Sequence, residues 1–308
     1  MLGRGVADAI RDGHDTLVDP DLLAIAAEPD LFVVNLECCI SERGERRRRP
    51  GKPFHFRAPP RAAELLAGWG VDCVTLANNH ALDFGPAALL DTLEHLRAAG
   101  VAWAGAGAGV REARAPRWLQ AGARRVALIA ATDHPADFAA AEQRPGVAFA
   151  DLEAGLPGWL AEALAATAGA DVRLCSVHWG PNMTAAPVPH VRAAARELRR
   201  SGATLVAGHS AHVPHGAAGG ILYDLGDFVD DYAVDERLRN DLGLLFLVEL
   251  GSDGSARGQA VPLELDYCRT GLATGRNAAL VGERFARACA ELGGDAELVD
   301  GRVRFALS

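Results

Sequence analysis

The sequence has one lysine, six cysteines and no long uninterrupted run of apolar residues. The cysteines form no C-x-x-C pair, and the adjacent Cys38 and Cys39 would need strained geometry to bridge one another, so reduced thiols are expected. No stretch reaches the roughly 18 apolar residues that a membrane span requires, and residues 1–15 lack the apolar centre of a signal peptide. These absences predict a soluble, cytoplasmic protein without a membrane partner.

Positive charge is also scarce. Lys and Arg together number 31 against 40 Asp and Glu, which leaves a formal charge of −9. An acidic chain repels a nucleic acid backbone, so we expect no nucleic acid partner. The 308 residues and the hydrophobic content of 49% are sufficient for a continuous core.

Short apolar runs alternate with longer segments of helical period, which predicts an α/β fold. We expect strands at 31–37, 72–77, 125–131, 172–178 and 203–208, and helices at 60–68, 86–99, 157–168 and 189–201. From about residue 219 the strands are closely spaced and one helix near 276–291 follows, so this half is expected to be more antiparallel. No Ser-, Gly- or Pro-rich linker separates the halves, so we expect a single domain over 1–308. The basic run at 45–49 is expected to be a solvated loop.

Polar residues follow four of the predicted strands directly, at the sheet edge where open α/β folds form their sites. These residues are Asn35-Leu36-Glu37, Asn78-Asn79-His80, His178-Trp179-Gly180 and Gly208-His209-Ser210-Ala211-His212. They combine one carboxylate with carboxamides and imidazoles, a ligand set that suits Zn²⁺, Mn²⁺, Fe or Co better than Ca²⁺. A single buried histidine at a strand end is more often a hydrogen-bonded core residue. Four such clusters in sheet order favour a site for one or two divalent metal ions.

Two cations about 3.5–4 Å apart activate a water and hold a tetrahedral anion during in-line attack. This chemistry is typical of phosphoester hydrolysis.

With these residues identified, the chain resembles the CapA family of poly-γ-glutamate capsule-biosynthesis proteins over most of its length. The segments that carry the resemblance are MLGRG, NLE, FHFRAPP, LANNHALDFG, VHWGPNM, AGHSAHV and YDLGDFVDDY. The resemblance implies a metallophosphatase-like fold, a four-layer α/β/β/α sandwich. It also implies an anionic small-molecule or polyglutamate-type substrate.

The resemblance implies a role for each strand-end residue. Glu37 is similar to a carboxylate that bridges two metals, and His212 would serve the metal that does not contact Asn79. The ligands of the other metal would be Asn79, His178 and His209. His80 resembles a histidine that lies beside the metals and protonates the leaving group, a role suited to an imidazole with a pKa near neutrality.

Further candidates surround these residues. Asp83 and Asp227 are expected to orient the histidines from behind, with a helix cap or turn role as the alternative. Five residues are weaker candidates for substrate binding: Arg4, Arg57, His55, His134 and His215. A guanidinium matches phosphate or carboxylate in a bidentate manner, which is the reason for including the arginines.

This sequence departs from the family pattern at two places. Family members begin with a strand that ends in Gly-Asp ahead of the MLGRG segment, and that Asp binds the first metal. Here Met1 stands where the segment is already under way, so either translation starts further upstream or the fold lacks its first strand and one ligand. We expect the sequence as printed to hold one tightly bound metal. Ser210 also stands where the family often has another histidine.

Three functions remain open at this stage. The first is a divalent-metal-dependent hydrolase of a phosphoester, or of an amide, linked to poly-γ-glutamate or related biosynthesis. The second is a non-catalytic, metal- and polyanion-binding component of polyglutamate capsule assembly. The third is a degenerate relative that has lost its metal, although the retained ligand candidates disfavour it. Substrate choice depends on loop shape, which the sequence does not reveal.

Overall fold

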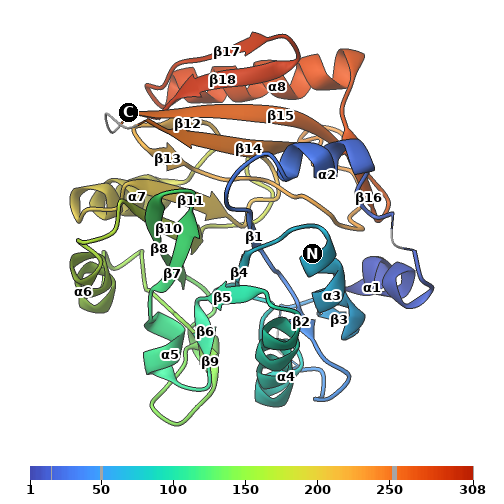
Figure 1. The fold of residues 1–308 in the computed structure, drawn as a ribbon, viewed down its shortest axis with the longest axis vertical. Coiled ribbons are helices and arrows are strands. Elements are labelled where there is room, and N and C mark those ends of the chain that lie inside the picture. Colours follow the sequence, from blue (N-terminus) through green and yellow to red (C-terminus); the bar gives the residue numbers. More distant parts are fainter. Residues whose placement is uncertain (15, 49–50, 252–254, 308) are drawn as a thin grey trace.

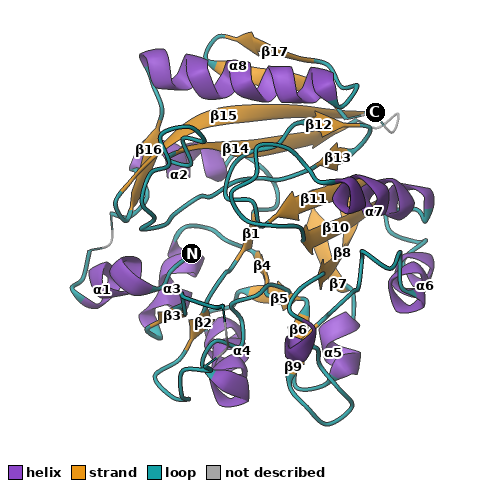
Figure 2. Cartoon of the chain, turned by 180° about the vertical axis from the view of Figure 1, so that it is seen from behind, coloured by secondary structure: helices purple, strands orange, loops and turns teal. Residues whose placement is uncertain are grey.

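The computed structural model describes residues 1–14, 16–48, 51–251 and 255–307, and its elements form a mixed α/β fold (Figures 1 and 2). One sheet has the order β12 (Ala217–Ala218), β13 (Ile221–Leu222), β11 (Leu205–His209), β10 (Val172–His178), β8 (Arg124–Thr132) and β7 (Arg117–Ala121). A parallel sheet has the order β1 (Val33–Asn35), β4 (Cys73–Thr75) and β5 (Ala102–Ala104). A third, antiparallel sheet has the order β14 (Leu242–Leu250), β15 (Ala256–Asp266), β18 (Arg302–Ala306) and β17 (Ala296–Val299), with β16 (Arg269–Leu272) also on β15. Two short pairs are β2 (Cys39–Ile40) with β3 (Arg57–Ala58) and β6 (Ala106–Gly107) with β9 (Gly146–Val147).

The helices connect and cover these sheets. They are α1 (Arg4–Arg11), α2 (Pro20–Ala26), α3 (Arg61–Gly68), α4 (Gly85–Ala98), α5 (Val110–Arg114), α6 (Gly158–Ala166), α7 (Pro189–Arg200) and α8 (Gly275–Glu291). A 3₁₀ turn spans Ala136–Phe138. Helix α7 illustrates why these segments are helical. It buries residues at helical spacing, Val191, Ala194, Ala195 and Leu198, and begins with Pro189, which fits a first helical turn.

The central strands β8, β10 and β11 are parallel, and their registers place functional residues at one level. Val126 to Thr132 of β8 are all buried, as expected for a parallel strand covered on both faces. In the β10 ladder, His178 lies opposite Thr132 of β8 and His209 of β11. The two histidines therefore reach the same carboxyl-terminal edge of the sheet.

The antiparallel sheet has its own apolar layer. Helix α8 lies along this sheet (Figure 1), and the ring of Phe285 packs edge-on against Phe305 of β18 with centroids 5.3 Å apart. Val281 and Cys289 of α8 and Val303 of β18 are also buried in this cluster. The packing closes one side of the fold with apolar contacts.

The predicted elements occur at the predicted places, with shorter ends at the first strands. The expected strand 31–37 is β1 at Val33–Asn35, and the helices expected at 60–68 and 189–201 differ from α3 and α7 by one residue at an end. The expectation of a more antiparallel half from residue 219 is confirmed only in part for β13, which pairs antiparallel with β12 and parallel with β11. After Leu222 the chain leaves the sheet, and Asp224 accepts hydrogen bonds from the backbone of Ala211 (2.8 Å) and Gly226 (2.9 Å). The antiparallel expectation is confirmed for β14 to β18.

Two other observations bear on the sequence expectations. All six cysteines are buried and free, in agreement with reduced thiols. In the described part of the chain, no helix has the length and apolar character needed to cross a membrane.

Candidate metal centre

The sheet of β1, β4 and β5 meets the sheet of β8, β10 and β11 where these parallel strands end. Ser176 of β10 donates a hydrogen bond to Thr75 of β4, with 3.3 Å between the hydroxyl oxygens. Because parallel strands present their carboxyl ends at one edge, the residues after β1 and β4 meet those after β10 and β11. All four predicted polar clusters therefore converge on one region.

His178 and His209 face each other in this region. Their Nδ1 atoms are hydrogen-bonded at 2.9 Å, and both side chains are buried. His209 Nε2 is also hydrogen-bonded to Ser176 Oγ at 3.1 Å. Burial lowers the pKa of His178 well below its ordinary value and that of His209 to about 3, so both imidazoles are neutral and keep a lone pair.

Glu37 and Asn79 approach from the other sheet. Glu37 is buried, and its Oε2 accepts a hydrogen bond from Asn35 Nδ2 at 3.1 Å. The neighbouring Asn78 has a structural role: its amide donates to Asn35 Oδ1 (3.0 Å) and to the carbonyl of Leu36 (2.9 Å). Asn78 therefore shapes the turn and leaves the side chain of Asn79 available as a ligand candidate.

His80 is held firmly in the same turn. Its Nδ1 is hydrogen-bonded to Asp83 Oδ2 at 2.6 Å, and its Nε2 lies 3.8 Å from Glu37 Oε1. The ring packs on Phe56 with centroids 4.0 Å apart. Burial lowers the pKa of His80, although Asp83 and Glu37 oppose this shift. The structure thus places Asp83 behind His80 and directs the other nitrogen toward Glu37.

His212 has a different electrostatic setting from the other histidines. Its Nδ1 lies 3.0 Å from Asp227 Oδ1, and its ring stands edge-on to Tyr232 with centroids 5.0 Å apart. Burial alone would lower the pKa of His212, but Asp227, with Glu37 and Asp224 nearby, raises it to about 10. His212 therefore carries a proton at neutral pH when no cation is present.

Three acidic residues after β13, Asp224, Asp230 and Asp231, are not among the predicted site residues, in contrast to Asp227 of the same YDLGDFVDDY segment. Burial raises the pKa of Asp224 to about 7, and burial with the nearby Asp227 raises that of Asp230 to about 7. Asp231 accepts a hydrogen bond from Gly5 N (2.8 Å) and pairs with Arg4 Nε (3.2 Å). Burial of these aspartates sets their contacts and, for Asp224 and Asp230, their pKa values, and it arises from packing between segments that are distant in the sequence.

The five weaker candidates for substrate binding have different surroundings in the structure. His134 is brought near the centre, with its ring 5.0 Å from that of His178. His215 is buried and hydrogen-bonded to the carbonyl of Thr184 at 2.8 Å, which supports a structural role. Arg4 and Arg57 lie against aromatic rings, Arg4 over Phe54 at 4.8 Å and Arg57 over Phe84 at 4.1 Å. His55 is hydrogen-bonded to the carbonyl of Arg47 at 2.7 Å.

Asp133 is a further residue that was not predicted. It binds the ring of His134 on one side, and its Oδ2 accepts from Gly180 N at 2.9 Å and lies 3.2 Å from His190 Nε2. Asp133 directly follows β8, so examining this fifth strand end in the sequence would have identified it.

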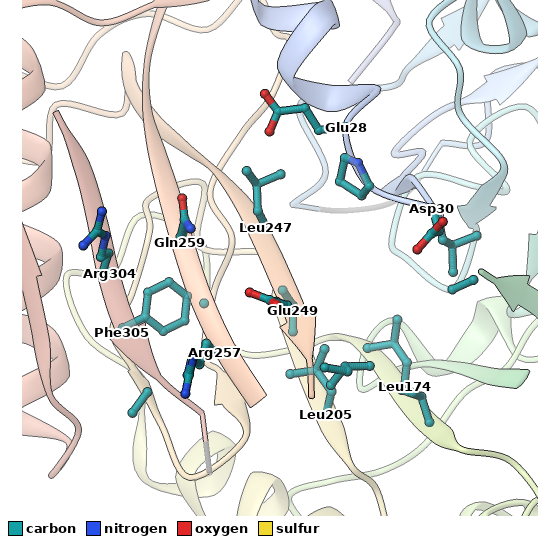
Figure 3. A pocket seen from close by; sticks show the side chains of 18 of the residues that line it. Glu28, Asp30, Leu174, Leu205, Leu247, Glu249, Arg257, Gln259, Arg304 and Phe305 are labelled. Carbon is teal, nitrogen blue, oxygen red and sulfur yellow. The ribbon is translucent and has the colours of Figure 1, made fainter. Parts of the chain in front are cut away.

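A cavity of about 270 Å³ extends from the centre between β1, β10, β11 and β14. Glu37, His209, His212 and Asp227 contribute to its lining, and the remaining walls are mainly apolar. A larger trough of about 1070 Å³ shares Leu174, Leu205 and Leu247 with this cavity. Figure 3 shows that charged side chains of both signs line the trough, among them Arg257, Arg304, Glu28 and Glu249.

The residue types of the centre suit a divalent cation, although their side chains do not surround a common point. Within the described ranges, no three His, Cys, Asp or Glu side chains are positioned together to hold a metal ion. Nine buried side-chain atoms in the described residues nevertheless have no hydrogen-bond partner, and three of them belong to predicted ligands: Glu37 Oε1, Asn79 Oδ1 and His178 Nε2. Buried polar atoms are usually satisfied, because leaving one unpaired costs about 1–3 kcal/mol. These three atoms of expected ligands offer the nitrogen and oxygen donors that such a cation takes.

The chain is similar to known proteins over most of its length. The model of the family described as bacterial capsule synthesis protein PGA_cap matches residues 1–232. Polyglutamine synthesis accessory proteins from two strains of Mycobacterium tuberculosis are 36% identical over 260 residues, covering 78% of this chain and 67% of theirs. The PGA biosynthesis protein CapA of Bacillus subtilis is 28% identical over 71% of this chain and 57% of its own length. The capsule biosynthesis protein CapA of Bacillus anthracis is 26% identical over 86% of this chain and 65% of its own length.

A solved structure was also found, that of a hypothetical protein from Thermus thermophilus. The match covers 83% of this chain and 93% of the other at 18% identity, with a TM-score of 0.39.

Proposed function

The chain belongs to the bacterial capsule synthesis protein family, and from this premise we propose that it is a divalent-metal-dependent hydrolase. The proposed substrate is an anionic phosphoester or amide connected with poly-γ-glutamate or a related polymer. The names of the Mycobacterium and Bacillus relatives support the connection with polyglutamate and capsule synthesis. The chain matches only part of the length of these relatives. The proposed activity therefore concerns this chain and is not taken from the whole relatives.

One observation carries the proposal. Buried, unpartnered donor atoms of Glu37, Asn79 and His178 lie at converging strand ends, where two neutral imidazoles face each other at 2.9 Å. Glu37, Asn79, His178 and His209 would hold one Mn, Zn, Fe or Co ion, and His212 with Glu37 would contribute to a second. The bound cation would supply an activated water and neutralise charge on a phosphoryl or acyl oxygen.

Side chains of the protein would supply the proton transfer and the surroundings of the reacting group. His80 donates Nδ1–H to Asp83, so its Nε2, which faces Glu37, passes a proton to the leaving group from the imidazolium form and is left as the neutral Nδ1–H tautomer. Asp83 keeps the imidazole from rotating and favours one tautomer. The apolar walls of the adjacent cavity limit water around the reacting group and strengthen these electrostatic interactions.

A finer fold proposal accompanies this function. The larger sheets would form the inner layers of a four-layer α/β/β/α sandwich with helices outside. The position of α8 along the antiparallel sheet supports this arrangement (Figure 1).

The test is hydrolysis by purified protein loaded with Mn²⁺ or Zn²⁺. An aryl phosphate and a γ-glutamyl anilide distinguish phosphoester from amide cleavage. The variants Glu37→Gln and His80→Ala serve as matched controls, because both side chains face the proposed reacting group. If the wild-type protein turns over both substrates no faster than the two variants do, with either metal, the hydrolase proposal is rejected.

A second candidate is a non-catalytic component that grips anionic polymer. The word "accessory" in the names of the Mycobacterium relatives supports it, as does the basic segment at residues 43–57, where Arg47 lies against the turn of Asp83. Saturable binding of poly-γ-glutamate without cleavage, measured by calorimetry with metal-loaded protein, would favour this candidate over the hydrolase.

A further inference from the structure

The only lysine of the chain, Lys52, lies against the turn that carries His80. Its side chain is 13% exposed, and Nζ is 2.6 Å from Asp83 Oδ1. Nζ also donates a hydrogen bond to the backbone carbonyl of Asn79 and lies 5.2 Å from the ring centre of Phe138. The loop residue therefore contacts both the expected metal ligand and the carboxylate behind His80.

Asp83 is the centre of this arrangement. Its side chain is fully buried, and Oδ2 accepts hydrogen bonds from Phe56 N (2.7 Å) and His80 Nδ1 (2.6 Å). A buried carboxylate is strongly destabilising without a compensating cation or sufficient hydrogen bonds. The Lys52 ammonium meets this need at the oxygen that His80 and Phe56 leave open.

The contacts of Lys52 also restrict the geometry of the site. By binding the carbonyl of Asn79 and the carboxylate of Asp83 together, Nζ joins the peptide directly before His80 to the group that orients its ring. Phe56 covers one face of that ring at 4.0 Å. The direction of Nε2 toward Glu37 therefore depends on Lys52 as well as on Asp83.

We propose that Lys52 is a positioning residue, which holds Asp83 and the Asn79–His80 peptide so that His80 Nε2 faces the reacting group. The inference rests on the hydrolase function proposed above and assigns Lys52 no contact with substrate. Lysine suits the position because a compact ammonium directs three donors to separate acceptors, whereas a guanidinium is planar and rigid. Arginine is therefore a poor replacement in spite of its charge.

The first test measures catalysis of an aryl phosphate by Lys52→Met and Lys52→Arg. A displacement of about 1 Å at a reacting group lowers rates by roughly 10²-fold, so we expect kcat to fall by roughly 10–10²-fold in both variants, with little change in KM. Bound metal, measured by elemental analysis, should remain. The matched control is Arg48→Met, which removes one positive charge from an exposed neighbour in the same segment. A kcat for Lys52→Met equal to that of Arg48→Met would overturn the proposal.

Chemical rescue separates positioning from a general effect on folding. The variant Lys52→Cys, alkylated with 2-bromoethylamine, regains an ammonium of nearly the original length. The six native cysteines are buried, so the introduced thiol is the reactive one. We expect most of the lost kcat to return after alkylation and none after methylation of the same thiol. Equal kcat for the aminoethylated and methylated proteins would contradict the proposal.

A labelling experiment keeps the test independent of activity. The sole lysine yields one lysine acetylation signal in mass spectrometry, and we expect acetic anhydride to modify Lys52 slowly in the wild-type protein. Asp83→Asn, which removes the ion pair, should accelerate modification at least several-fold. Equal rates would overturn the placement of Lys52 even if the hydrolase is real. A wild-type protein without turnover, but with slow labelling accelerated by Asp83→Asn, would reject the proposed function and retain the Lys52–Asp83 contact.

Discussion

The protonation of His212 predicts that two metal ions bind this centre with different pH dependence. Asp227 holds the pKa of His212 at about 10, whereas burial keeps that of His209 at about 3. An ion that takes His178 and His209 as ligands therefore meets neutral imidazoles at pH 7. A second ion that takes His212 must first displace a proton.

The size of this effect follows from the pKa. At pH 7 a group with a pKa of about 10 is protonated about 10³-fold over its neutral form, so deprotonating His212 costs about 4 kcal/mol. The second ion should bind about 10³-fold more weakly than it would to a neutral histidine in the same place. Its apparent affinity should rise about tenfold for each pH unit below the pKa of His212, because one proton leaves for each ion bound.

Calorimetric titration with Mn²⁺ at pH 6.5, 7.5 and 8.5 measures this difference. We expect about one tightly bound ion per chain, with an affinity that changes little over this range, and a second, weaker ion with the tenfold dependence. Asp227→Asn removes the carboxylate that raises the pKa of His212, so the second affinity should become less dependent on pH. Two tight ions at pH 6.5, or equal pH dependence for both, would refute the assignment of a protonated His212.

Other predictions concern single residues. Glu37→Gln should lose most of the metal that the wild-type protein retains after purification without chelator, and equal metal content in elemental analysis would remove Glu37 from the ligand set. His80→Ala should keep its metal yet lose on the order of 10²–10⁴ in kcat, the usual contribution of general acid–base catalysis, and loss of metal would instead make His80 a ligand. A hydrogen bond from Arg43 lowers the pKa of Asp91 below its ordinary value of 3.8, so ionised Asp91 stabilises the fold above that value and the contribution disappears as the pH falls through the folded-state pKa. Urea unfolding should therefore show that Asp91→Asn is less stable than wild type at pH 6 and that the difference narrows toward pH 3; a constant difference would contradict this linkage.

The sequence by itself determined the main elements and the location of the polar clusters. The apolar runs of β8, β10 and β11 and the helical spacing in α7 are local signals. Each can be read from a short stretch of neighbouring residues in the sequence. The rule that sites form after parallel strands then selected Glu37, Asn79, His178 and His209. The structure brings the ends of these strands together, as their pairing and the Ser176–Thr75 contact show.

Only the tertiary structure decided the electrostatic roles. Lys52 and Asp83 are 31 positions apart in the sequence, and Asp133 reaches His190 across 57 positions. No local pattern marks these pairs, since they depend on how separate loops pack over the strand ends. His212 is a similar case. Its position after β11 is evident from the sequence, but its protonation depends on the nearby Asp227. Burial and long-range charge pairing set pKa values, and both arise only when the chain is folded.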